Sequence, residues 1–97
     1  MSRFVDHVGV PNTPSNFTAT TSSTQMLAAN PQRRGLVVIN LGTANVSFGC
    51  NGATAVLNSG ITLLPNGTWV MDQFTFCNTV INVIAGGSCA LSIQEYV

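Results

Sequence analysis

The titratable and nucleophilic side chains that could perform chemistry are few in this sequence and far apart. There is one histidine, His7, beside Asp6, and the three cysteines are Cys50, Cys77 and Cys89. Acid–base catalysis needs at least two well-placed titratable groups, and a cysteine nucleophile needs a base that only His7 could supply. No GxSxG, P-loop or HExxH motif occurs. The sequence therefore predicts no catalytic residues, and we expect no enzyme activity.

The cysteines also lack the spacing of a metal site or a disulfide framework. They are odd in number and widely separated, whereas zinc sites usually contain close pairs such as CxxC. We interpret all three as reduced, buried, small hydrophobic residues. The alternative is one disulfide with one thiol left over. We expect no metal ion and no cofactor.

Arg33 and Arg34 are the one cluster of charge in the chain. They are either two solvated side chains ahead of a strand, or guanidinium groups that pair with carboxylates or carbonyls of a neighbour. Because an unpaired cation is costly to bury, we expect at least one of them to order a subunit or partner contact. Leu36 and Val38, in the apolar run that follows, are predicted to belong to the same contact.

The aromatic residues Trp69, Phe74 and Phe76 lie close together in the sequence. Aromatic residues of strands are usually part of a hydrophobic core, and we interpret these three in that way. The alternative is a platform on which a sugar ring stacks, as in lectins.

The length and composition of the chain limit the number of domains and the classes of partner. A chain of 97 residues predicts one domain. Charged residues make up 6% of it, against about 25% in ordinary soluble domains, while 45% of the residues are hydrophobic. The zero net charge argues against nucleic acid and anionic membranes as partners. No apolar run approaches the roughly 20 residues of a membrane span, and no signal peptide is recognised, so we expect a soluble protein made in the cytoplasm, with a surface suited to docking.

The chain divides into two parts. Residues 1–24, with Pro11, Pro14 and a run of Ser and Thr, predict an extended N-terminal arm that lies across its own sheet or reaches a neighbouring subunit. Residues 25–97 consist of short apolar segments separated by turn residues, which predicts seven to eight strands with hairpin-length connections. We expect an all-β fold, an antiparallel β-sandwich, with the jelly roll as one form it could take.

Several strands and turns can be placed within residues 25–97. Residues 36–39 are a continuous apolar run, so both faces of that strand are expected to be covered, one by the core and one by something else. Residues 88–94 alternate strictly, which predicts a strand with one buried face. Asn51-Gly52 predicts a tight turn with positive φ angles, and Pro65-Asn66-Gly67 predicts a second turn.

One further pattern is NPQRRGLVVIN at residues 30–40, followed by residues 46–49, by ITLLPNG at residues 61–67 and by a β-rich finish. This pattern resembles small virion structural proteins of tailed bacteriophages, over roughly residues 25–95. The resemblance implies a capsid decoration, or cement, protein that binds and stabilises the assembled head shell. Its alternative implication is a head-fibre or tail-associated virion protein that binds host glycan.

The resemblance also implies partners and a location. They are the major capsid protein and other copies of this chain, as a homotrimer with arms that reach neighbouring capsomers, in a virion whose proteins are made in the host cytoplasm. A surface poor in charge fits this expectation, because salt would screen little of the binding at many repeated contacts.

Overall fold

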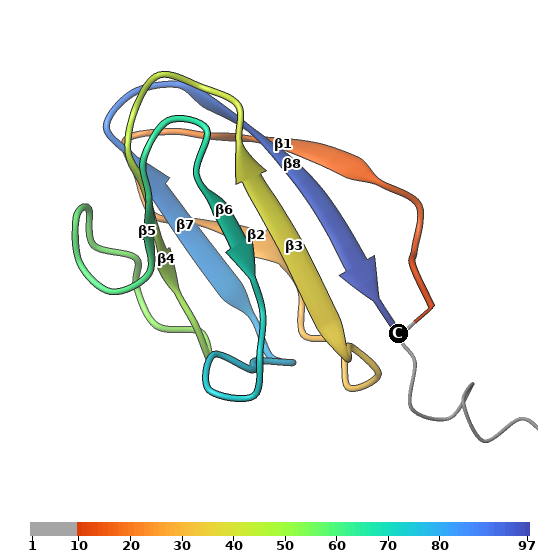
Figure 1. Cartoon of the computed structure of the whole chain (residues 1–97). Helices are drawn as coiled ribbons and strands as arrows, with labels where there is room; N and C mark the ends of the chain where they lie inside the picture. The colour runs from red at the N-terminus through yellow and green to blue at the C-terminus, as the bar shows by residue number, and fades with distance from the viewer. Residues whose placement is uncertain (1–9) are drawn as a thin grey trace, which may run out of the picture.

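The computed structural model describes residues 10–97, and these residues form eight strands and no helix (Figure 1). The strands are β1 (Ser15–Ala19), β2 (Thr24–Leu27), β3 (Gly35–Asn40), β4 (Val46–Gly49), β5 (Thr62–Leu63), β6 (Thr68–Val70), β7 (Ile81–Ala85) and β8 (Cys89–Tyr96). Within this range no helix has the length and hydropathy needed to cross a bilayer. The all-β expectation is confirmed.

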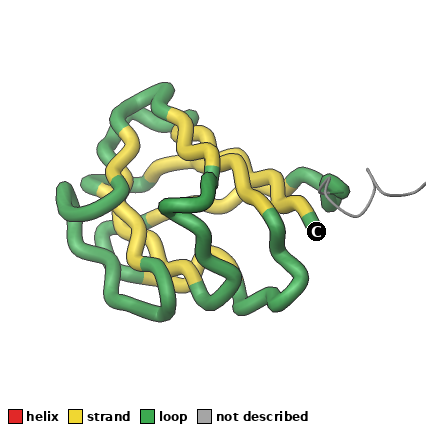
Figure 2. The backbone as a smooth tube through the Cα atoms, turned by 60° about the horizontal axis from the view of Figure 1, so that its bottom comes forward, coloured by secondary structure: helices red, strands yellow, loops and turns green. Residues whose placement is uncertain are grey.

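Two antiparallel sheets of four strands pack against each other, as the sandwich prediction requires (Figures 1 and 2). Sheet A has the order β1-β8-β3-β6, and sheet B has the order β2-β7-β4-β5. The pairs β1 with β8, β2 with β7, β3 with β6 and β4 with β5 are nested within one another along the chain. The β-sandwich is therefore confirmed, while its description as a jelly roll stays a prediction.

The inner faces of the strands follow the alternation of the sequence. In β8, Cys89, Leu91 and Ile93 are buried while the residues between them are more accessible, which confirms the strand predicted over residues 88–94. In β3, Leu36 and Val38 are buried and Val37 and Ile39 are half-buried. The strand at residues 36–39 is therefore confirmed, but only its inner face is fully covered by the described residues.

The two predicted turns take the expected backbone conformations. Asn51 and Gly52 have φ angles of 59° and 75°, and Asn66 has a φ of 67°. However, the turn at Asn51-Gly52 does not lead into a strand that pairs back on β4. The partner of β4 is β5, so residues 53–61 form a loop between them.

The structure corrects the division between arm and sandwich. All five residues of β1 pair with β8, and β2 already begins at Thr24, so residues 15–24 belong to the sandwich. The sequence does not indicate this strand, because β1 lies at the edge of sheet A and joins it mainly through backbone pairing. Of its five residues, only Ala19 is buried. Residues 1–9, the rest of the expected arm, lie outside the described residues.

The core lies between the two sheets and is mainly aliphatic, with Trp69 against Phe48 at a ring-centroid distance of 5.1 Å. Its buried amide, Asn40, is satisfied on both ends: Nδ2 donates to the Ala44 and Leu63 carbonyls at 2.8 and 3.2 Å, and Oδ1 accepts from the Gly42 N–H at 2.9 Å. Hydrogen bonds of this kind remove the cost of burying a polar group.

Candidate docking face and its surroundings

Arg33 lies inside the fold, and its side chain is not exposed to a partner. Its side chain is fully buried, and Nε donates to Glu95 Oε2 at 2.6 Å. The remaining nitrogens donate to three carbonyl oxygens, those of Cys77 and Thr79 from Nη1 and that of Ala28 from Nη2, at 2.8 to 3.0 Å. The predicted pairing of a guanidinium group with a carboxylate and with carbonyls occurs, but within the chain, so the assignment of Arg33 to a subunit contact is corrected.

Leu36 and Val38 are also corrected as contact residues. Both are buried in the core between the sheets, with 1% and 0% of their surface exposed. The side chains of β3 that leave the core are Val37 and Ile39, which alternate with them. An unbroken apolar run does not reveal which alternate set faces inward, because both sets are apolar.

The outer face of sheet A is uncharged, and the described residues do not cover it. Its side chains form rows across the strands, because paired positions point to the same side of a sheet. One row is Asn16, Ser92, Ile39 and Thr68; the next is Gln94, Val37 and Val70; the third is Tyr96 with Gly35. All are half-buried or exposed, and Val70 is 62% exposed. We call this set of residues the open face.

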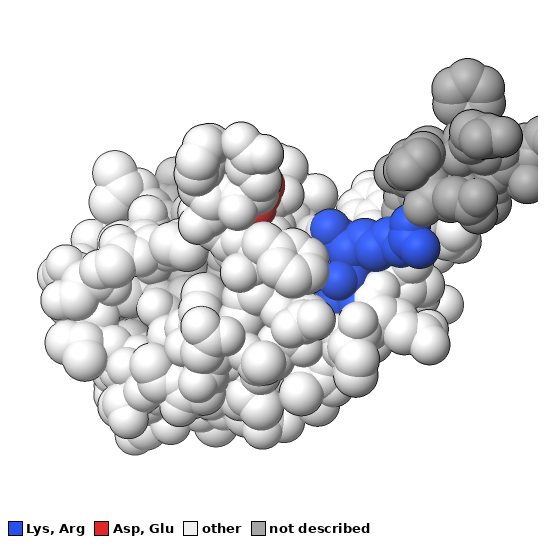
Figure 3. Space-filling view, turned by 90° about the horizontal axis from the view of Figure 1, so that it is seen from below, with Lys and Arg blue, Asp and Glu red and all other residues white. Residues whose placement is uncertain are grey.

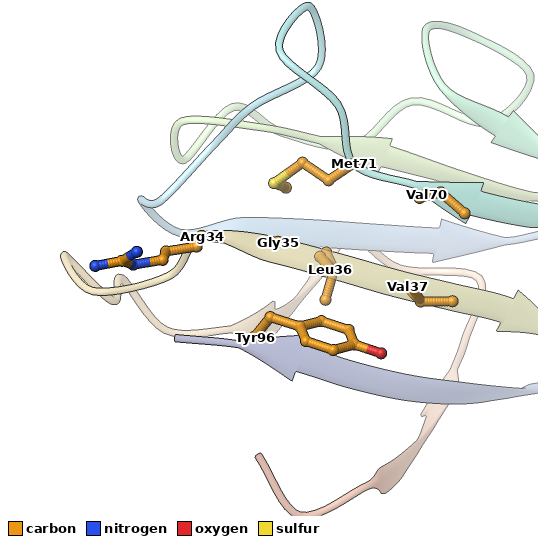
Figure 4. A pocket seen from close by; sticks show the side chains of 7 residues that line it. All are labelled: Arg34, Gly35, Leu36, Val37, Val70, Met71 and Tyr96. Carbon is orange, nitrogen blue, oxygen red and sulfur yellow. The ribbon is translucent and has the colours of Figure 1, made fainter. Parts of the chain in front are cut away.

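A shallow pocket of about 350 Å³ lies at one end of the open face (Figure 4). Val37, Val70 and Tyr96 give it apolar walls, and Gly35 leaves room beside the Tyr96 ring because it has no side chain. Arg34, the fourth predicted contact residue, is exposed and lines the same pocket. The structure thus places Arg34 at a surface, on the rim of the open face.

The outer face of sheet B is covered by its own chain over β4. Ser47 points away from the core yet is fully buried, because residues 50–61 fold over it: its Oγ lies 2.8 Å from Thr62 Oγ1 and accepts from the Asn58 N–H at 2.8 Å. Asn82 Nδ2 fastens the same loop by donating to the Ala53 carbonyl at 2.8 Å. The two outer faces therefore differ, and sheet A is the one that residues 10–97 leave uncovered.

Phe74 is held out into solvent by a fixed turn between β6 and β7, and is 85% exposed. Asp72 Oδ1 accepts from the Phe74 and Thr75 N–H groups at 2.9 and 3.0 Å. These two bonds lower the pKa of the Asp72 carboxyl below its ordinary value, the bond to Thr75 contributing most. The core interpretation is therefore wrong for Phe74, and also for Phe76, which is 49% exposed.

Trp69 is confirmed as a core residue. It is 5% exposed, and its Nε1 donates to Thr75 Oγ1 at 3.4 Å, which links the core to the Phe74 turn. A stacking platform for a sugar ring cannot include Trp69 in this arrangement, because the indole faces are packed inside the sandwich.

The charged residues of the described part are few, and two of them bind each other inside the fold. In Figure 3 the basic residues gather in one patch, while most of the visible surface is uncharged. Among residues 10–97 no group of three or more His, Cys, Asp or Glu side chains is placed to hold a metal ion. His7 and Asp6 lie outside the described residues, and the absence of catalytic residues stays a prediction.

Sequence reasoning missed three features of this region: the internal role of Arg33, the exposed Phe74 and the loop over β4. A signal existed for the second, since Asp72 is followed at short range by Thr75, and such residues favour local side-chain bonds to the backbone. The other two depend on contacts between segments that are distant in the sequence.

Comparison with known proteins places the fold but not the function. The chain matches no protein-family model, and no curated protein matches it. A crystal structure of PirA is similar, with a TM-score of 0.50 and 9% identity over 89% of this chain and 94% of that chain. A structure from work on Bacillus endospore appendages, described as disulfide-linked pili, has a TM-score of 0.45 and 13% identity over 91% of this chain and 88% of that chain. The first similarity supports the β-sandwich fold.

Proposed function

We propose that this protein is a structural subunit of a virion that binds the assembled outer shell as a decoration, or cement, protein. The observation that carries the proposal is the open face, a broad uncharged sheet surface that the described chain leaves uncovered while it covers part of the opposite sheet. The resemblance of roughly residues 25–95 to small virion proteins suggests the kind of partner. The open face supplies the means of attachment.

Attachment through the open face would rest on apolar burial and shape. Val37, Ile39, Val70 and Tyr96 contribute apolar surface, and burying such surface is worth about 25 cal/mol per Å² before the costs of association are subtracted. Arg34 lies on the rim of this face.

The proposed partners are the major capsid protein and other copies of this chain, the latter as a homotrimer. A ligand that binds only the assembled shell must stabilise that shell against disassembly. Particles that lack this protein should therefore release their DNA at a lower temperature than complete particles. Thermal release curves with a DNA-binding dye measure this difference, and coincident curves would rule out a cementing role.

A matched pair of variants tests whether the open face makes the contact. Val70→Asp places a charge on the open face, and Val56→Asp places one on the loop between β4 and β5, where Val56 is 58% exposed. Because both sites are exposed, both variants should fold. We expect Val70→Asp to abolish binding to particles that lack the protein, and Val56→Asp to bind normally, as measured by cosedimentation. Equal binding by the two variants would remove the open face from the proposal.

The second candidate function is a head-fibre or tail-associated protein that binds host glycan. The observation that favours it is Phe74, an aromatic ring held in solvent by the bonds of Asp72 and Thr75. A fixed, exposed ring of this kind suits stacking against a sugar. Loss of glycan-array binding in Phe74→Ala, with Phe74→Tyr retaining it, would support this function, and an unlabelled array with the native protein would reject it.

A further inference from the structure

Two of the three cysteines lie near each other where two loops meet. Cys50 directly follows β4 and is half-exposed, while Cys77 lies in the loop before β7 and is buried. Each thiol lies close enough to the other to influence its pKa, and the side-chain oxygen of Asn51, the residue after Cys50, is 3.7 Å from Cys77 Sγ. Neighbouring cysteines of this kind are candidates for a disulfide bond, provided that their backbones are held in place.

The backbones on both sides of this contact are held by other bonds. The Gly52 N–H donates to the Val80 carbonyl at 2.9 Å, and Thr79 Oγ1 donates to Asn51 Oδ1 at 2.6 Å. Cys77 Sγ lies 3.3 Å from Thr79 Oγ1 and 3.7 Å from Asn51 Oδ1. In addition, Arg33 Nη1 donates to the Cys77 carbonyl at 2.9 Å. The two segments are thus held side by side without a bond between the two sulfur atoms.

Cys89 has a different environment. Its Sγ donates to Asn40 Oδ1 at 2.9 Å and to the Ala44 carbonyl at 3.5 Å, and the residue is 1% exposed within β8 of sheet A. Neither of these contacts involves another cysteine. The structure therefore distinguishes a neighbouring pair from a single buried thiol.

We propose that Cys50 and Cys77 form an intramolecular disulfide when the folded protein meets a two-electron oxidant such as hydrogen peroxide, and that Cys89 stays a thiol. This inference does not depend on the proposed function. It concerns the alternative of one disulfide with one leftover thiol, and it assigns the pair from spatial contact, which the spacing of the cysteines in the sequence does not give.

The chemistry requires a nucleophile and a resolving thiol. Burial acts to raise the pKa of Cys77, but hydrogen bonds from Thr79, Asn51 and Cys50 outweigh it and leave the pKa below its ordinary value. Burial, with the neighbouring Cys77, raises the pKa of Cys50 to about 11. The lower pKa favours Cys77 over Cys50 as the thiolate that attacks the peroxide.

The oxidation proceeds in two steps. The Cys77 sulfur attacks one peroxide oxygen, the O–O bond breaks, and the products are a sulfenic acid on Cys77 and water. The Cys50 sulfur then attacks the sulfenic sulfur, the S–S bond forms, and the hydroxyl leaves as a second water with the proton of the Cys50 thiol. Two thiols are oxidised and one peroxide is reduced to two waters.

The bond would fasten the loop over β4 to the loop that carries Phe74. A disulfide stabilises a fold chiefly by restricting the unfolded chain, so the oxidised protein should be more stable than the reduced one. A protein made in a reducing compartment and released to an oxidising one would gain this bond after it has folded.

The test uses the native protein, reduced, desalted and treated with hydrogen peroxide under native conditions. Alkylation after unfolding and intact mass should show one modified cysteine instead of three, and nonreducing peptide mapping should recover residues 50 and 77 as one linked species. The melting temperature should rise on oxidation and return with dithiothreitol. Three alkylated cysteines, a link that includes Cys89, or only intermolecular dimers would overturn the proposal.

Two variants separate the pair from the remaining thiol. Cys89→Ala should still form the bond and should show the rise in melting temperature on oxidation. Cys50→Ala removes the more exposed partner and should show no such rise. If Cys50→Ala does not fold, the mapping of the native protein still decides, because it needs no variant.

Discussion

At the scale of single residues, the guanidinium group of Arg33 joins three parts of the chain. It contacts Glu95 on β8 and the carbonyls of Ala28 and Cys77, which lie in separate loops. Removing one partner of a buried ion pair leaves the other charge unpaired, and typically costs about 3–5 kcal/mol. We expect Arg33→Ala to lower the free energy of unfolding by about this amount, as measured by chemical denaturation.

Lysine at the same position should not rescue this loss, because a point charge cannot replace a planar donor with several N–H groups. Gln32→Ala is the control, since Gln32 is exposed and surface substitutions usually stay within about 0.5 kcal/mol. If the Arg33→Lys variant is as stable as the native protein, the several N–H donors of the planar guanidinium group are not what stabilises this site.

The Asp72 turn predicts a local pH dependence. Because hydrogen bonds from Thr75 and Phe74 lower the pKa of this carboxyl, the stability that it contributes is present above the pKa of the unfolded chain. It is lost as the pH falls through the lower pKa of the folded state. The amide resonances of Phe74 and Thr75 should therefore titrate in acid, with a midpoint below the ordinary aspartate value.

The Asp72→Asn variant provides the comparison for this titration. It retains an oxygen acceptor but cannot change its charge, so the acid transition of the two amides should disappear. A midpoint at or above the ordinary aspartate value in the native protein would show that the turn does not stabilise the carboxylate.

At the scale of elements, the loop over β4 depends on Gly49. A Cβ atom at Gly49 would lie 2.2 Å from the Ala53 carbonyl oxygen, so the loop must move if any side chain is present. We expect Gly49→Ala to lower the free energy of unfolding by about 1–3 kcal/mol, the usual range for overpacking. Gly87→Ala is a matched control, because nothing lies within 4 Å of its Cβ position. Equal stability of the two variants in urea would show that the loop is not held close to β4.

The elements that sequence could predict are those whose side chains alternate or whose turns need special residues. β8 has strict alternation, and Asn51 and Gly52 tolerate the positive φ of their turn. β1 was missed because its residues are mostly polar and its pairing with β8 involves the backbone. The open face could be predicted only in part: the apolar character of β3 was evident, but the register that puts Val37 beside Val70 was not.

At the scale of the whole molecule, the scarcity of charge predicts how attachment responds to salt. Raising the salt concentration from about 0.1 M to about 1 M shortens the Debye length from about 10 Å to about 3 Å. Because the open face has no charged residue apart from Arg34 on its rim, particle binding should change little over this range. Cosedimentation at both concentrations measures it, and a large loss of binding would indicate a different, charged contact surface.

The position of β8 has a consequence for how the protein is made. β8 lies between β1 and β3, so sheet A has no continuous hydrogen bonding until this last strand is present. A nascent chain on the ribosome can bring β4 and β5 together early, but β1 must wait without its partner for most of translation. Folding is therefore expected to be completed only after β8 has left the exit tunnel, and a chain that stops before β8 should be a substrate for chaperones and proteases.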